Sequence, residues 1–478
     1  MTWVAAATLA SRGASFAATV VVAHLIVPSE LGRLTVAMMA VSAFGWLGDG
    51  GIGAALIRSR RPLEELTATA TSLTVLLTLA LTVCVWTVGP LIGAVIHDAR
   101  SATLIRTAAF MLPIAALGAV PGAALDRAME FKRRLPADVS GPLLALAMTP
   151  FLIRSAHLGA EGVIVARLAG SAVSLVMLWA IARIRPRLGF DTGAARELVG
   201  FSRYIAGGAL VVYLVTNLDN AVVGRYAGLA ALGSYGLAYT IANIPASELA
   251  DAASRVLFPA FVTLRDDPPR LARAYGRSLR SLLMIGTPVV ALLTAVPAPF
   301  YALVCGPRWS AAAGPTTGLG VFVLIRMLAG ATGAVLTLGP KPKYVLWTGL
   351  GGIPVQLAFL WLFVVHSNGG ATGAAWAMSC ASAVNAVVIG AVVARVIAFP
   401  MRAAAHEALR ALAPSLVAMA VGIPTCSTLG ATATSLLVTL GVMGAAFAMT
   451  LRVTVGPRPV ATSMRIIRSA DSDHAEDA

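Results

Sequence analysis

The sequence predicts an all-α, polytopic integral membrane protein with about fourteen transmembrane helices. Three observations predict this fold class: the composition, a series of apolar runs of spanning length, and an alternation of basic loops. Hydrophobic residues make up 58% of the 478 residues, charged residues make up 12%, and mean hydropathy is +0.83. Soluble domains carry about 25% charged residues, so a soluble core of this size would lack polar cover. A surface that faces lipid removes this difficulty.

Fourteen runs are apolar over the length of about 20 residues that a spanning helix needs. In chain order, they cover residues 3–27, 34–57, 67–90, 103–124, 138–157, 161–182, 203–223, 231–260, 281–304, 312–337, 344–365, 371–394, 407–426 and 432–451. Proline and glycine recur inside these runs, as membrane helices tolerate. The first run lacks a basic leader and a cleavage site, so we expect a spanning helix rather than a removed signal peptide.

The loops between these runs alternate in charge. If the N-terminus is cytoplasmic, the even-numbered loops and the C-terminus hold 26 Arg and Lys residues, whereas the odd-numbered loops hold 6. Basic residues collect on the cytoplasmic side of membrane proteins, so the pattern predicts that both termini are cytoplasmic. The net charge of +15 is therefore explained without nucleic acid, because the basic residues form no single patch.

An internal repeat divides the chain. Val21-Val22, Leu31-Gly32 and Ala37 recur 201 residues later as Val222-Val223, Leu232-Gly233 and Ala238, with no gap. An offset of six helices, an even number, predicts two halves that run in the same direction. Chance identity in a sequence rich in Ala, Val and Gly is the alternative.

The repeat predicts four regions. Two six-helix lobes occupy residues 1–190 and 195–398 and are joined by a basic loop. Two further helices lie within 399–454. The tail 455–478, which is acidic and without apolar periodicity after Arg468, is expected to be cytoplasmic and disordered.

Motifs for enzymatic chemistry are absent or misplaced. The segment Gly48-Asp49-Gly50-Gly51-Ile52-Gly53 fits a dinucleotide fingerprint, but it falls in a membrane run, where small residues favour close helix packing instead. The chain has no phosphate-binding loop with a Gly-Lys pair, no paired histidines of a zinc helix and no Cys pair with ligand spacing. We therefore expect no cofactor, no metal and no catalytic residue, which means that the protein is not an enzyme.

Charged residues inside the apolar runs are the candidate functional residues. Each costs at least about 2.5 kcal/mol at a helix centre, so such residues usually face a bundle interior or a wet cavity. They are Arg12, Arg167, Arg255, Arg326, Asp49, Asp219, Glu248 and Asp251. Glu248, Asp251 and Arg255 share one helical face, where an ion pair between Asp251 and Arg255 that only joins helices is an equal alternative.

The loop 265–280 places Leu271, Tyr275 and Leu279 on one side and arginines around them. This pattern favours a short helix on the cytoplasmic membrane surface, and a solvated connector is the alternative.

Short segments in a fixed order along the chain form a recognisable set. Its members are Pro28-Ser29-Glu30-Leu31-Gly32, Asp49 with residues 54–58, residues 217–225 (NLDNAVVGR), residues 232–239 (LGSYGLAY), Ile244-Pro245, Phe258-Pro259 and Gly306-Pro307-Arg308-Trp309. This ordered set, which covers about residues 1–400, resembles the polysaccharide transporter family of the multidrug/oligosaccharidyl-lipid/polysaccharide flippase superfamily.

The resemblance implies two lobes around a central cavity that opens alternately to each side of a bacterial plasma membrane. It also implies a substrate, a lipid-linked oligosaccharide that is typically carried on a polyprenyl pyrophosphate, and glycan-assembly partners. In such a cavity, we expect Arg12, Arg255 and Arg326 to attract the phosphate of the substrate. Asp49, Asp219 and Asp251 are expected to balance charge or to couple transport to an ion.

Two other functions stay open. A cation-coupled drug exporter of the same superfamily would depend on buried carboxylates more than on arginines. A membrane glycosyltransferase or polymerase would need acidic catalytic residues in a large outer loop, and every outer loop of this chain is short.

Overall fold

The computed structural model describes residues 13, 16–49, 51–59, 61–184, 187–338, 343–397, 399, 401–429 and 432–455. Every regular element in these ranges is helical. The chain divides into two compact units, Met1–Gly236 and Leu237–Ala478. The division falls inside one long helix, whose first turns belong to the first unit.

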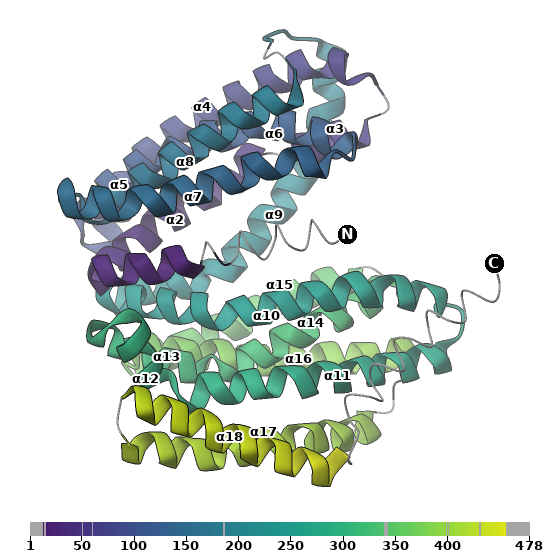
Figure 1. Cartoon of the computed structure of the whole chain (residues 1–478). Coiled ribbons are helices and arrows are strands. Elements are labelled where there is room, and N and C mark those ends of the chain that lie inside the picture. Colours follow the sequence, from purple (N-terminus) through teal and green to yellow (C-terminus); the bar gives the residue numbers. More distant parts are fainter. Residues whose placement is uncertain are drawn as a thin grey trace. The chain divides into compact units, whose positions relative to one another are not determined.

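The first unit begins with an apolar helix, Phe16–Leu25, and continues through eight labelled helices to the start of α10 (Figure 1). Their bounds are α2 (Pro28–Asp49), α3 (Ile52–Arg58), α4 (Leu63–Ile96), α5 (Ala99–Ala109), α6 (Met111–Arg127), α7 (Phe131–Ser155), α8 (Gly159–Ala182) and α9 (Thr192–Tyr226), and α10 covers Leu229–Thr263. The predicted run 103–124 is thus two helices that meet at Phe110, and the run 34–57 is α2 followed by α3.

The second unit continues from α10 to the last described helix (Figure 1). Its bounds are α11 (Pro268–Ala295), α12 (Pro297–Phe300), η1 (Tyr301–Cys305), η2 (Pro307–Ala312), α13 (Ala313–Gly318), α14 (Gly320–Leu338), α15 (Lys343–Leu360), η3 (Trp361–His366), α16 (Gly370–Ile397), α17 (Met401–Leu429) and α18 (Ala433–Val455). The last pair lies side by side and packs on the end of α11 through Ala295, Ala418 and Met443.

The protein is a multi-pass membrane protein. In the part of the chain that the structure describes, ten helical segments are long and apolar enough to cross a membrane. They are Leu63–Ile96, Ala99–Arg127, Lys132–Ser155, Gly159–Ala182, Pro268–Ala295, Gly320–Thr337, Gly349–His366, Gly370–Ile397, Leu409–Cys426 and Thr434–Leu451. The total of fourteen spans stays a prediction.

Segment 265–280 differs from its expected structure. The helix α11 runs without a break from Pro268 to Ala295, so the arginine-rich segment is the first part of a long helix and not a separate surface helix. Two prolines at its first positions favour this start, and the Asp267 side chain caps it by accepting a hydrogen bond from the Arg270 amide.

The loops of the first unit collect in two groups. Contacts join the chain around Glu30, Asp98 and Ala160, which are the first, third and fifth predicted loops. Other contacts join the second, fourth and sixth loops, because Arg127 donates to the Arg61 carbonyl and Arg61 pairs with Asp191. Odd and even loops at opposite ends are the arrangement that antiparallel spanning helices require.

The repeated segments meet at their glycines. A Cβ on Gly32 of α2 would overlap the carbonyl oxygen of Leu229, and a Cβ on Gly233 of α10 would overlap that of Pro28. Pro28 and Leu229 are themselves 201 residues apart, as are Gly32 and Gly233. The contact is therefore reciprocal, which is the form that a two-fold relation between repeats produces. This reciprocity favours a true repeat over chance identity.

Candidate functional site

Two of the predicted arginines lie on neighbouring helices of the second unit. Arg326 is on α14, between Phe322, whose ring lies 5.7 Å from that of Tyr239 on α10, and Gly330, which packs against Ala250 of α10. Positions 322, 326 and 330 share one face of α14, so Arg326 lies on the side of this helix that meets α10. Its side chain is exposed although the residue lies within the apolar span Gly320–Thr337.

Arg255 and Asp251 lie further along α10, and both side chains are exposed. Residues four apart share a helical face, so an ion pair between these two stays the alternative to a role in substrate binding. The structure therefore places Arg255, Asp251 and Arg326 on neighbouring helices, α10 and α14, with both guanidinium groups exposed.

Asp219 is fully buried in α9, within the first unit. Its Oδ2 atom accepts a hydrogen bond from the Tyr235 hydroxyl of α10 at 2.5 Å, while its Oδ1 atom has no partner among the described residues. A buried carboxylate with one free oxygen is costly unless a proton or a cation neutralises it. Tyr235 was not expected from the sequence, since nothing in its local pattern points to Asp219.

The four remaining candidates have different outcomes. Glu248 is half-buried on α10. Arg12 lies outside the described residues. Asp49 ends α2, but its side chain also lies outside what the structure describes. Arg167 is exposed on α8, and its Nη1 atom lies 3.2 Å from the sulfur of Met38 on α2.

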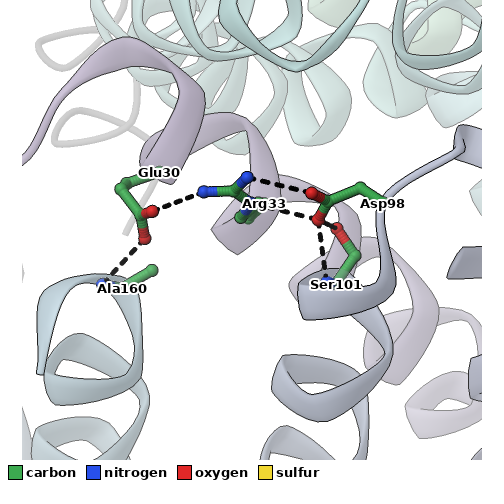
Figure 2. Close-up of polar contacts among 5 residues, drawn as sticks. All are labelled: Glu30, Arg33, Asp98, Ser101 and Ala160. Atoms are coloured by element: carbon green, nitrogen blue, oxygen red, sulfur yellow. Dashed lines mark hydrogen bonds and ion pairs between the residues drawn. The ribbon is translucent and has the colours of Figure 1, made fainter.

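A charge network in the first unit, drawn in Figure 2, was not predicted from the sequence. The Arg33 guanidinium donates from Nη2 to Asp98 Oδ1 at 2.9 Å and from Nε to Asp98 Oδ2 at 3.0 Å, and it pairs through Nη1 with Glu30. Asp98 also accepts from the Ser101 amide and hydroxyl, and Glu30 accepts from the Ala160 amide at 3.3 Å. The only sequence signal was Asp98 three residues before Ser101, a helix-capping spacing.

The network joins the first turns of α2, α5 and α8. One guanidinium faces two carboxylates, and the extra negative charge lies at the N-termini of α5 and α8, where the helix dipoles are positive. The Arg33 hydrogen bonds lower the pKa of Asp98 below its ordinary value, against an opposing effect of burial. The members of the network bond to one another and to backbone amides, which fixes three helix ends relative to one another.

Comparison with known proteins identifies the family. Residues 21–314 match the family described as polysaccharide biosynthesis protein. Lipopolysaccharide biosynthesis protein WzxC of Escherichia coli is 29% identical over 339 residues, which are 70% of this chain and 68% of the relative. Teichuronic acid biosynthesis protein TuaB of Bacillus subtilis is 24% identical over 78% of this chain and 77% of its own length. Succinoglycan biosynthesis transport protein ExoT of Rhizobium meliloti is 26% identical over 74% of each chain.

Solved structures show the same fold. The lipid II flippase MurJ in an inward closed conformation aligns with a TM-score of 0.77 over 95% of this chain and 98% of the flippase, at 14% identity. An inward-facing multidrug resistance MATE family transporter of the MOP superfamily aligns with a TM-score of 0.66 over 80% of this chain and 94% of the transporter, at 18% identity. The resemblance found in the sequence is confirmed, and the chain belongs to the polysaccharide biosynthesis protein family.

Proposed function

We propose that this protein is a flippase that turns a lipid-linked oligosaccharide from the cytoplasmic to the outer leaflet of the bacterial plasma membrane. Family membership supports this proposal, and so do relatives named for lipopolysaccharide, teichuronic acid and succinoglycan biosynthesis. The observation that carries it is the pair of exposed arginines, Arg255 and Arg326, on α10 and α14 within apolar surroundings. The protein transports its substrate without changing it chemically, so it needs no catalytic residue.

Arginine suits the pyrophosphate end of such a substrate. Its planar guanidinium donates two parallel hydrogen bonds to phosphate oxygens, which an ammonium group cannot do. An exposed arginine at membrane depth needs water or an anion, since hydrocarbon offers neither. A wet cavity that receives a polyprenyl pyrophosphate supplies both. Arg12 is the third arginine of the proposed phosphate site.

In the proposal, three carboxylates either balance this positive charge or couple transport to an ion. Asp251 lies one turn from Arg255 on α10, and Asp49 ends α2. Asp219, buried beside Tyr235, is the group best placed to take up a proton or a cation as the transporter changes state. Coupling to an ion gradient is consistent with a sequence that contains no ATP-binding loop.

The proposed mechanism is alternating access between two lobes, 1–190 and 195–398, around a central cavity. The helices of 399–454 are additions to the second lobe, and the tail 455–478 is a cytoplasmic extension. Both termini are cytoplasmic in this proposal, so the substrate enters from the side where glycan-assembly enzymes attach sugars to the lipid carrier.

The test is glycan export in a strain that lacks the chromosomal gene. We expect Arg326→Ala to lose most export at normal membrane abundance, and Arg326→Lys to lose nearly as much, because a lysine cannot form the bidentate contact. Arg308→Ala is the matched control, since this exposed arginine lies in a predicted outer loop. Full export by Arg326→Ala and Arg255→Ala would show that the arginines do not bind the substrate.

A further inference from the structure

The first half of α11 presents a row of arginines on one face. Arg270, Arg273, Arg277 and Arg280 follow one another at intervals of three, four and three residues, and all four side chains are exposed. Residues at these intervals lie on the same side of a helix. We refer to these four residues as the arginine face.

Packing on the opposite side fixes the direction of this face. Leu271, Ala272 and Tyr275 are buried in the core of the second unit. The Tyr275 ring lies 5.0 Å from Phe399 and 6.5 Å from Phe261, and its hydroxyl lies 3.1 Å from that of Thr332. These contacts prevent α11 from turning, so the arginines point away from the core of the unit.

The charge of the arginine face is largely uncompensated. Asp267 pairs with Arg270 at 3.2 Å, and this pair is itself well exposed. Within the described part of the chain, no salt bridge is recorded for Arg273, Arg277 or Arg280. The face is therefore a site of net positive charge that an external anion can approach.

The position of the face along α11 matches the boundary of the hydrocarbon core. This core is about 30 Å thick, which corresponds to about 20 helical residues. Counted back from the end of α11 at Ala295, this length reaches Gly276, at the centre of the arginine row. All four guanidinium groups then reach the headgroup layer, since arginine side chains extend toward the interface.

The same side of α11 is covered by protein where the arginines end. Thr287, Ala291 and Ala295 continue this side and are buried, and the two alanines pack with Ala418 of α17 and Met443 of α18. The arginine face is therefore the part of this side that stays exposed. It lies at the boundary of the hydrocarbon core, where lipid phosphates are the anions that the membrane itself supplies.

We propose that the arginine face binds the phosphate groups of anionic phospholipids in the leaflet at the N-terminal end of α11. In the proposed topology, this is the cytoplasmic leaflet. The site is distinct from Arg255 and Arg326, and it holds annular lipid rather than the transported substrate. Its function is to set the depth and tilt of α11 in the membrane.

The experiment measures lipid binding by the full chain, purified in detergent. Phosphatidylglycerol or phosphatidylcholine is titrated, and bound lipid is counted by native mass spectrometry. We expect the wild-type protein to prefer phosphatidylglycerol, and the double variant Arg273→Gln/Arg277→Gln to lose this preference. Each arginine near an anionic membrane surface contributes about fivefold in affinity, so the expected loss is roughly 25-fold.

The matched control is Arg187→Gln/Arg196→Gln, which removes the same charge from exposed positions of the first unit. This control variant should keep the wild-type preference for phosphatidylglycerol. Added salt should weaken that preference in the wild-type protein and in the control variant. The single variant Arg273→Gln serves if the double variant is poorly folded.

Three results would overturn the proposal. The first is equal binding of the two lipids by the wild-type protein, and the second is equal loss in the control variant. The third is normal phosphatidylglycerol binding by Arg273→Gln/Arg277→Gln together with lost glycan export, which would assign the face to the substrate. Lipid binding does not require transport, so the lipid-binding result could still be interpreted if the flippase proposal failed.

Discussion

Charged side chains in this chain have two kinds of surroundings, and these predict different mutational effects. Arg33 and Asp98 are mostly buried and satisfy each other, with 18% and 15% of their side chains exposed. Arg255 and Arg326 are exposed within apolar segments. The first kind should contribute to stability, whereas the second should contribute to transport.

At the residue scale, Asp98→Asn should lower the free energy of unfolding by about 2 kcal/mol at neutral pH, because it removes a charge-assisted pair. Asparagine still caps α5, so the loss reports the Arg33 contact rather than the helix start. Thermal unfolding in detergent measures it. The Arg100→Gln variant, which changes an exposed side chain on α5, is the control.

The pH dependence of this difference has a defined sign. The folded pKa of Asp98 is below its unfolded value, so its stabilisation is complete above the unfolded pKa of about 4 and is lost as the pH falls toward the folded value. The wild-type protein and Asp98→Asn should therefore converge in stability below about pH 4. A constant difference over this range would contradict the assigned ion pair.

At the scale of elements, the crossing of α2 and α10 depends on the absence of side chains at Gly32 and Gly233. Gly233→Ala should destabilise the protein by about 1–3 kcal/mol, because the new Cβ would overlap the Pro28 carbonyl and force the helices apart. Gly200→Ala is the matched control, since that helical glycine of α9 has open space around its Cβ position. The same melting temperature for the two variants would contradict the close approach of α2 and α10 at Gly233.

Helix positions could be predicted from the sequence better than helix ends. Long apolar runs identified α4, α8 and α16 because lipid selects composition directly. The start of α11 was missed, since Arg270 to Arg280 interrupt the apolar pattern and the burial of Tyr275 depends on Phe261 and Phe399, which are distant in sequence. In the same way, composition indicated Asp219 as a candidate but could not indicate Tyr235, whose position depends on how α9 and α10 pack.

At the scale of the whole molecule, the alternation of basic loops predicts the orientation in the membrane. Reporter fusions after Met129 and after Asp266 should be cytoplasmic, and a fusion after Arg308 should be external, because 26 of the basic loop and tail residues lie on the even side. The grouping of loops in the first unit supports the same alternation. An external reading after Met129 would contradict the topology.

The central claim, translocation of a lipid-linked glycan, is tested most directly with purified protein in vesicles. The probe is undecaprenyl pyrophosphate carrying a fluorescent N-acetylglucosamine, present in both leaflets, and a reductant that cannot cross the membrane bleaches the outer leaflet. Vesicles with the wild-type protein should lose the protected inner signal over time, whereas vesicles with Arg326→Ala should keep most of it. Persistent protection with correctly folded wild-type protein, under an imposed proton or sodium gradient of either direction, would contradict the proposed function.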